Sequence, residues 1–237
     1  MKYENYFKNH YKPVTEYEYA YSRKYNEMNI LPYLKRFNEN SSIVEIWSWH
    51  WTFAKYLSEQ WFKNYIWFEI DDDMTKSLNS IFTDYKFYSS DVFEYLKSNP
   101  NSIDVLFMSN VFEHFTAEDW EKLNKLIYDS LREWGILINI MPNAGSVFMS
   151  TYWRYNDITH EIIYTENSYN HTLLNSWFNL GDIAHENIYF CSPSKLKLII
   201  WISLQKILLL FMKYLFLLTG FPYGKVSTFE ILTIARK

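Results

Sequence analysis

The segment from Ser42 to Phe53 constrains the fold of this chain more than any other. Residues 43–46 form a short apolar run, which is typical of a buried strand, and a five-residue turn follows. After the turn, apolar residues recur at helical spacing, at Phe53, Ala54, Leu57 and Trp61. The segment therefore predicts a strand, a tight turn and a helix, and the turn contains three tryptophans, Trp47, Trp49 and Trp51.

Such a turn holds a nucleoside cofactor when glycine lets backbone N–H groups approach the ligand at the start of the helix. Glycine also reaches positive φ without strain. An indole does neither, and it buries about 150–250 Å². Three indoles in one turn would therefore occupy the volume of the ligand.

Residues 44–51, VEIWSWHW, resemble the first motif of class I S-adenosylmethionine (SAM)-dependent methyltransferases, with tryptophan at each of its three glycine positions. The family motif is hydrophobic-hydrophobic-Glu-hydrophobic-Gly-x-Gly-x-Gly. The resemblance implies that SAM is the cofactor and that this turn binds it, through Glu45, Trp47, Ser48, Trp49 and Trp51.

Tryptophan also stands where the family has glycine at Trp67 and Trp134, and at two helix ends, Trp61 and Trp177. The chain has 5 glycines and 10 tryptophans, whereas a usage of about 7% would give roughly 16 glycines. These observations support the hypothesis that UGA codons, read as glycine in the source organism, are written here as tryptophan. The alternative is a methyltransferase-like protein whose real tryptophans fill the cofactor site. UGG codons at Trp47, Trp49 and Trp51 would exclude the recoding.

Composition limits the class of protein. A chain of 237 residues with 49% hydrophobic and 21% charged residues predicts one globular domain. A net charge of −4 argues against a nucleic-acid-binding surface. The single cysteine, Cys191, excludes a disulfide framework and fits a reducing cytoplasm, and the polar N-terminus shows no signal peptide.

A second buried strand, residues 65–70, ends in an acid. In the family, a carboxylate at this strand end accepts hydrogen bonds from the ribose hydroxyls, which implies that Glu69 and the adjacent Ile70 bind the cofactor. A third short strand leads into Asp91-Val92, which resembles the family loop that binds the adenine amino group. The alternative for Asp91 is a helix N-cap.

The fourth strand begins at Ile103 and leads into the sequence Asn110-Val111-Phe112-Glu113-His114. This resembles the family's hydrophobic-Glu-His motif, which implies that Asn110 and Val111 lie beside the methionine part of SAM and that His114 fixes the loop. A capping box at residues 116–119 then predicts a helix in which Trp120 is a core residue. The six histidines are dispersed and Cys191 is alone, so we expect no metal site.

The remaining strands are predicted at residues 136–143, 180–190 and 229–235. Strands that alternate with helices predict a parallel, doubly wound sheet. With the resemblance, the expected fold is a seven-stranded Rossmann-like α/β sheet, mostly parallel with an antiparallel last strand. We expect an N-terminal helical cap at 1–40 and a methyltransferase domain at 41–237, with an apolar helical insertion at 195–222.

Residues 153–161, WRYNDITHE, resemble a segment of methyltransferase-domain proteins, many of them associated with surface-polysaccharide or glycolipid pathways. Histidine is the side chain that most often serves as a general base, so His160 is the candidate base, and Asp157 could orient it. Arg154, with Tyr155 beside it, could bind a carboxylate or phosphate of the acceptor. An equal alternative is that Asp157 and His160 only hold a lid by hydrogen bonds.

The insertion, residues 196–221, is nearly all apolar and long enough to cross a bilayer. Lys206 and Lys213 share a helix face with Ser203, which favours a helix in the membrane interface. A span would separate strands six and seven, which belong to one sheet. Peripheral membrane contact is therefore expected, at the inner face of the membrane of a cytoplasmic protein, with homodimerisation or core packing as alternatives.

We therefore predict a SAM-dependent methyltransferase that methylates a hydroxyl of a small-molecule, sugar, polyprenyl or lipid-linked acceptor, with no nucleic-acid partner. Alignment of the reactants would supply most of the catalysis. One alternative is an inactive membrane-associated scaffold whose cofactor site is filled by tryptophan. A second is another nucleotide-dependent Rossmann enzyme such as a dehydrogenase, which NAD binding would reveal.

Overall fold

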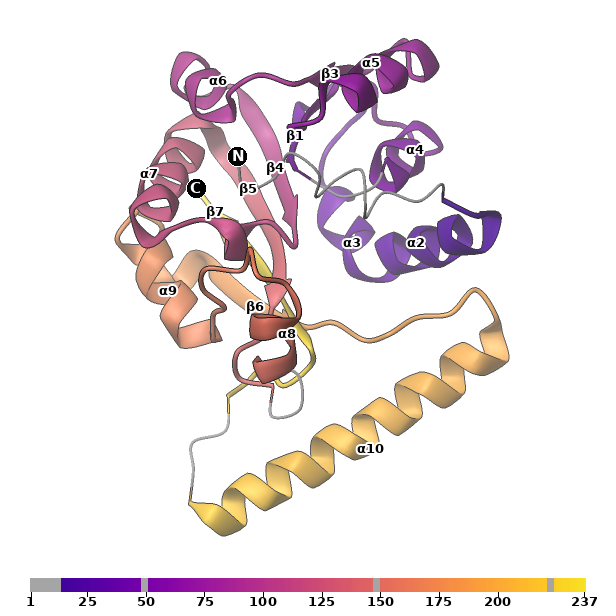
Figure 1. The fold of residues 1–237 in the computed structure, drawn as a ribbon, viewed down its shortest axis with the longest axis vertical. Coiled ribbons are helices and arrows are strands. Elements are labelled where there is room, and N and C mark those ends of the chain that lie inside the picture. The colour runs from indigo at the N-terminus through magenta and orange to yellow at the C-terminus, as the bar shows by residue number, and fades with distance from the viewer. Residues whose placement is uncertain (1–13, 48–50, 147–149, 221–223) are drawn as a thin grey trace.

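The computed structural model describes residues 14–47, 51–146, 150–220 and 224–237. Seven strands form one sheet in the order β3-β2-β1-β4-β5-β7-β6 (Figure 1). Neighbouring strands pair in parallel except at β7, which is antiparallel to both β5 and β6. The predicted fold class is therefore confirmed. The strands are β1 Ile43–Ile46, β2 Tyr65–Phe68, β3 Lys86–Tyr88, β4 Ile103–Ser109, β5 Leu131–Pro142, β6 Ile183–Asn187 and β7 Glu230–Arg236.

Helices cover both faces of the sheet (Figure 1). Strand residues alternate between two buried apolar clusters: Ile43 packs in the cluster that includes α4, and Val44 packs with α6, α7 and α9. A parallel sheet covered on both faces needs such continuous apolar strands. The helices are α2 Glu16–Asn29, α3 Leu31–Leu34, α4 Thr52–Ser58, α5 Asp72–Ile81, α6 Val92–Ser98, α7 Ala117–Ser130, α8 Ser150–Asn156, α9 Glu166–Leu174 and α10 Lys195–Thr219, with the 3₁₀ turns η1 Phe112–His114 and η2 Leu180–Asp182.

Four predicted strands have boundaries that are wrong by one to five residues. Strand β2 ends at Phe68, two residues before the predicted end. Strand β5 starts at Leu131, five residues before the predicted start, because Leu131 pairs with Ile103 across an irregularity in the β4–β5 register. Strand β6 is shorter than predicted because the chain at Leu180–Asp182 forms a 3₁₀ turn. Strand β7 is displaced by one residue. Strand boundaries depend on which residues pair with the neighbouring strand, and the periodicity of the sequence does not reveal this pairing.

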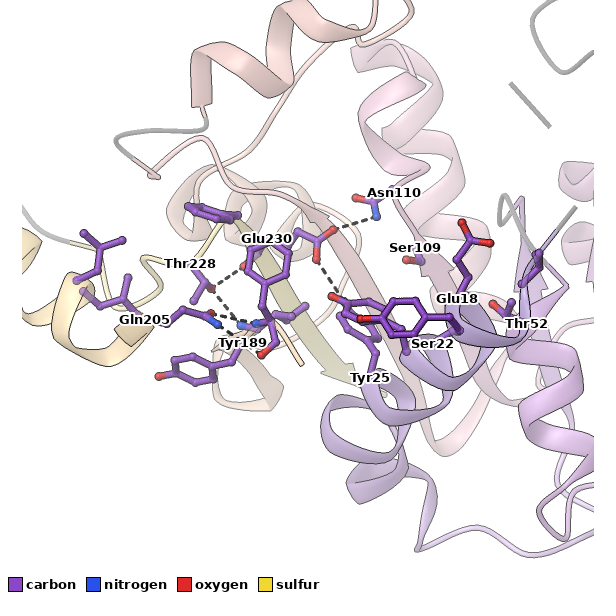
Figure 2. A pocket seen from close by; sticks show the side chains of 18 residues that line it. Glu18, Ser22, Tyr25, Thr52, Ser109, Asn110, Tyr189, Gln205, Thr228 and Glu230 are labelled. Carbon is purple, nitrogen blue, oxygen red and sulfur yellow. Dashed lines mark hydrogen bonds between the residues drawn. The ribbon is translucent and has the colours of Figure 1, made fainter. Parts of the chain in front are cut away.

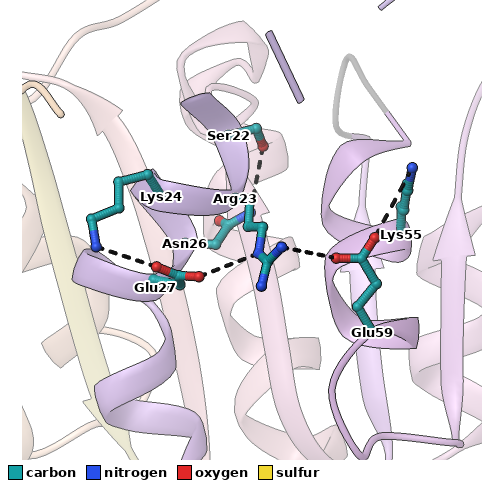
Figure 3. A network of polar contacts seen from close by, with 7 residues as sticks. All are labelled: Ser22, Arg23, Lys24, Asn26, Glu27, Lys55 and Glu59. Atoms are coloured by element: carbon teal, nitrogen blue, oxygen red, sulfur yellow. Dashed lines mark hydrogen bonds and ion pairs between the residues drawn. The ribbon is translucent and has the colours of Figure 1, made fainter. Parts of the chain in front are cut away.

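Helix α2 is tied to α4 by a chain of surface ion pairs (Figure 3). Arg23 of α2 lies 3.3 Å from Glu27 and 4.0 Å from Glu59, the C-cap of α4, and Lys55 lies 4.0 Å from Glu59. Exposed pairs of this kind contribute at most about 1 kcal/mol each. They join the exposed surface of α2 to the C-terminal end of α4.

Helix α10 is inserted between β6 and β7 and extends beside the rest of the domain (Figure 1). It is long and apolar enough to cross a membrane by length and composition, and 6% of its most apolar window is buried. Near its middle, the Gln205 side chain accepts a hydrogen bond from the backbone N–H of Phe190 at 3.0 Å. Gly220, at φ 69°, ends the helix. The predicted insertion is therefore a single helix whose two ends return to adjacent strands.

Candidate active site

A cavity of about 600 Å³ lies at the carboxyl edge of the parallel strands (Figure 2). Six parts of the fold supply its walls: helix α2 with the residue before its N-cap, the start of α4, the end of β4, the segment after β6, helix α10 and the segment that enters β7. An open parallel sheet binds its ligands at this edge. The lining residues used below are Tyr21, Tyr25, Ser109, Asn110, Leu208, Leu209 and Glu230.

A polar centre forms where β4 ends and β7 begins (Figure 2). The Asn110 side-chain amide donates to Glu230 Oε1 at 3.1 Å, and the Tyr25 hydroxyl donates to Glu230 Oε2 at 3.3 Å. Burial raises the pKa of Glu230. Asn110 has φ 54°, and its Oδ1 is buried without a hydrogen-bond partner in the described part of the chain. The centre therefore offers a carboxylate and an amide oxygen to a ligand.

Sequence reasoning missed Glu230 and Tyr25. Glu230 was one acid at the start of a predicted strand, and Tyr25 was one of 21 tyrosines. The available signal was topological, because the start of an antiparallel strand lies at the same edge as the ends of its parallel neighbours.

The structure places Glu69 directly after β2, next to the turn that follows β1. Its carboxylate is 3% exposed, and Glu69 Oε1 accepts the backbone N–H of Ile70 at 2.7 Å. Burial raises the pKa of Glu69 to about 7. The Ile70 side chain itself is exposed. A buried acid at this strand end has the position and chemistry that hydrogen bonding to a ribose diol requires.

The other predicted cofactor residues have mixed surroundings. Asp91 forms the helix N-cap that the sequence allowed as its alternative, with Oδ1 accepting the backbone N–H of Phe93 at 2.8 Å. Val92 and Val111 are buried in the apolar cluster beneath the site. Glu45 is buried and accepts a hydrogen bond from the Tyr65 hydroxyl.

In the turn after β1, Trp47 and Trp51 stack their indoles on other aromatic rings. Trp47 has φ 44° and stacks on Phe115, with ring centroids 5.1 Å apart. Trp51 stacks on Tyr19 at 6.3 Å. Ser48 and Trp49 lie outside the described residues. The cavity lining includes neither Glu69 nor Asp91, so the cavity is separated from the predicted ribose and adenine residues.

The segment after α8 forms several hydrogen bonds. This agrees with the alternative in which the segment is a lid that Asp157 and His160 only help to hold in place. Asp157 Oδ1 accepts from the Thr159 backbone N–H at 2.8 Å and from its hydroxyl at 2.6 Å. Thr159 Oγ1 lies 2.9 Å from His114 Nδ1. Arg154 donates to the backbone carbonyl of His160, so its guanidinium is also engaged within the segment. Tyr155 is 75% exposed.

His160 is buried and is not among the residues that line the cavity. Its Nε2 lies 3.9 Å from Glu113 Oε1, and its ring centroid lies 4.8 Å from that of His114. Burial raises the pKa of Glu113 to about 8 and lowers that of His114 to about 4. This position favours the lid-fixing role for His160.

The histidines were expected to be dispersed, but His114 and His160, which are 46 positions apart in sequence, lie next to each other in the fold. Ligand atoms of Glu113, His114 and His160 lie within 4.8 Å of one another, a spacing that could hold a metal ion. Sequence spacing could not reveal the cluster, because the lid brings His160 back onto the loop after β4.

Comparison with known proteins agrees with the fold and the motifs. Residues 52–139 match the protein family described as a methyltransferase domain. A SAM-dependent methyltransferase structure from Archaeoglobus fulgidus is similar at a TM-score of 0.62 and 21% identity, covering 91% of this chain and 94% of that one. A second, from Mesorhizobium loti, gives 0.56 and 14%, covering 87% and 96%. The comparison with curated proteins gives no match. The methyltransferase-domain match over residues 52–139 and the shared seven-stranded fold support a SAM-dependent methyltransferase, for which SAM is the expected cofactor.

Proposed function

We propose that this methyltransferase methylates a hydroxyl group on a lipid-linked or polyprenyl-linked acceptor at the inner face of a membrane. The observation that carries the proposal is the composition of the cavity. Asn110 and Glu230 line one part, and Leu208 and Leu209 of the apolar helix α10 line another. A ligand that fills this cavity must have a polar group and an adjoining apolar part.

Apart from the tryptophans of the turn after β1, the residues at the sheet edge suit the cofactor. Glu69 is a buried carboxylate for the ribose hydroxyls, and the unpartnered Oδ1 of Asn110 is an acceptor beside the cavity. Asp91, although an N-cap, lies after β3 at the place for an adenine contact. SAM, when bound, supplies an electrophilic methyl group on a sulfonium.

Glu230 is the group that we assign as the general base. Its carboxylate lines the cavity and is held by Asn110 and Tyr25, and burial raises its pKa, which makes it a stronger base than an exposed carboxylate. With SAM bound, Glu230 would accept the proton of the acceptor hydroxyl as its oxygen bonds to the methyl carbon. The methyl–sulfur bond would break at the same time, and its electron pair would remain on the sulfur as a neutral thioether. Most of the rate enhancement then comes from alignment of the reacting atoms. We assign His160 and Asp157 to positioning of the lid.

Helix α10 supports attachment to a membrane surface. It carries four lysines and no acidic residue. Lys195, Lys206 and Lys213 fall on one face by helical spacing, and Lys197, near the start of the helix, falls on the opposite face. Large apolar side chains on the opposite face are exposed, including Leu204 and Phe211. Such a helix lies in the interface with its apolar face among the acyl chains. A span is disfavoured because the flanking strands β6 and β7 pair directly.

Two measurements test the proposal. Calorimetry with SAM compares the chain as written with a chain that has glycine at positions 47, 49 and 51. Transfer of labelled methyl from SAM is then compared between a polyprenyl-linked sugar and the same sugar without the lipid. We expect SAM binding by the glycine chain and preference for the linked sugar. Failure of the glycine chain to bind SAM would favour an inactive scaffold, and equal use of both sugars would refute the lipid-linked acceptor.

A further inference from the structure

We propose that glycine, not tryptophan, occupies positions 47, 134 and 177 in the protein that the source cell makes. The backbone at these positions has φ 44°, 70° and 72°, in the left-handed region. Among the described non-glycine residues, the others with positive φ are Asn101 and Asn110. Asparagine is the residue type that tolerates this region, whereas a bulky side chain there is a steric outlier.

Position 177 has the hydrogen bonds of a Schellman motif, the helix ending that requires a left-handed residue. The backbone N–H of Phe178 donates to Leu173 at 3.2 Å, and that of residue 177 donates to Leu174 at 3.2 Å. Glycine is the usual residue at this place because it has no Cβ. Gly220 ends α10 at φ 69°, within a few degrees of Trp177. The chain therefore contains a glycine in nearly the same backbone conformation.

Position 134 lies near the amino end of β5, remote from the cavity. Its indole is 70% exposed, so little packing offsets the backbone conformation. The next residue, Gly135, also needs to be glycine, because a Cβ there would lie 2.9 Å from the Arg132 carbonyl oxygen. The backbone is thus that of a two-glycine turn with one glycine written as tryptophan.

Position 47 connects the inference to the cofactor, and this part depends on the proposed function. It is the first glycine position of the turn after β1, and its indole stacks on Phe115 instead of leaving the backbone bare.

Trp67 adds an independent observation in the neighbouring strand. Its side chain is fully buried, and its indole N–H has no hydrogen-bond partner in the described chain. Unpaired buried donors are rare because they lose hydration without compensation.

Translation offers one cause for all four sites. UGA and UGG are both written as tryptophan when a sequence is decoded with a code that assigns UGA to tryptophan. A cell that reads UGA as glycine would place glycine at the UGA sites and tryptophan at UGG sites. The 5 glycines and 10 tryptophans of the chain fit this mixture. Trp120, in helix α7 and packed against the core, is expected to be a true tryptophan.

The codons and the native protein give the direct test. We expect UGA at positions 47, 134 and 177, UGG at 120, and glycine-containing peptides when the protein purified from its source cells is digested and measured by mass spectrometry. UGG codons, or tryptophan in those peptides, would overturn the proposal.

Recombinant variants test the backbone argument separately from cofactor binding. Trp134→Gly and Trp177→Gly should each raise the folding equilibrium constant roughly tenfold. Trp134→Ala and Trp177→Ala keep the Cβ and should gain much less, and Trp120→Gly should lower stability. Equal stability of the glycine and alanine variants would contradict the inference. Both sites lie away from the cavity, so this result stands even if the chain with glycine at position 47 fails to bind SAM.

Discussion

The side-chain amide of Asn110 donates to the Glu230 carboxylate across 3.1 Å, although 120 residues separate them in sequence. Asn110 follows a parallel strand and Glu230 starts the antiparallel one, so both lie at the same edge of the sheet. Helix α2 adds the hydroxyl of Tyr25 from the opposite side of the cavity. The polar centre of the proposed site is thus created by strand order, and no short sequence motif contains it.

Replacement of the proposed base should slow the chemical step. Glu230→Gln retains the shape of the side chain and removes its capacity to accept a proton, so we expect kcat to fall by about 10²- to 10⁴-fold. Tyr25→Phe removes a single hydrogen bond to Glu230 and should cost roughly tenfold or less. Single-turnover kinetics measures both. A near-normal Glu230→Gln enzyme, together with an inactive His160→Asn enzyme, would transfer the role of base to His160.

Cofactor affinity should depend on pH through Glu69. Ribose hydroxyls donate best to an ionised carboxylate, and the pKa of Glu69 is about 7, so SAM should bind more tightly as pH rises from 6 to 8. Glu69→Gln should weaken binding by roughly 10- to 100-fold and remove this pH dependence. Calorimetry at several pH values on the chain with glycine at 47, 49 and 51 gives the result. A pH dependence that persists in Glu69→Gln would assign it to another group.

The same carboxyl should affect stability with the opposite sense. Its folded-state pKa is raised from 4.5 to about 7, so the folded state holds the proton more tightly than the unfolded state. Without SAM, the free energy of unfolding should therefore fall as pH rises from about 4.5 through about 7. Denaturant titrations of wild type and Glu69→Gln should diverge over this range, with the variant the more stable above pH 7. Parallel curves would contradict the buried position of Glu69.

The lid should be held chiefly by Thr159. Thr159→Val removes its hydroxyl contacts with Asp157 and His114, so a looser lid should raise KM several-fold and change kcat less. Treatment with a chelator distinguishes this role from metal binding by the Glu113–His114–His160 cluster. We expect unchanged activity after chelation. Loss of activity that a divalent cation restores would instead identify the cluster as a metal centre.

Membrane attachment should depend on the exposed apolar face of α10. Leu204 and Phe211 are exposed and lie outside the cavity, so their joint replacement by glutamate should abolish co-sedimentation with vesicles and leave methylation of a soluble acceptor unchanged. Lys206→Gln with Lys213→Gln should weaken binding to anionic vesicles by about 1 kcal/mol per lysine and spare neutral ones. Vesicle binding by the glutamate variant would refute this orientation of the helix.

Much of the fold could be predicted because alternation of apolar strands and helices determines a doubly wound sheet. Buried runs such as residues 43–46 and 103–109 were located correctly. Strand ends were less predictable, since Leu131 joins β5 only by pairing with Ile103. Periodicity describes the segment itself, whereas pairing depends on a neighbour that is remote in sequence.

The candidate site was predicted only in part. Glu69 and Asn110 are recognisable because each directly follows a strand whose end must face the ligand. Glu230 was missed. His160 was proposed as a base because its chemistry fitted, but it lies outside the cavity lining. Its position depends on how the segment after α8 folds back onto Glu113. Side-chain chemistry can be read from sequence, whereas the direction in which a side chain points requires the fold.

Strands β6 and β7 pair directly over five residues, although α10 separates them along the chain. The hairpin therefore does not need the helix in order to form. A chain in which a short turn replaces α10 should keep the sheet and the Asn110–Glu230 contact while losing one wall of the cavity. Helix α10 would then determine the membrane attachment of the protein and the apolar character of its substrates. The remaining sheet would determine the chemistry.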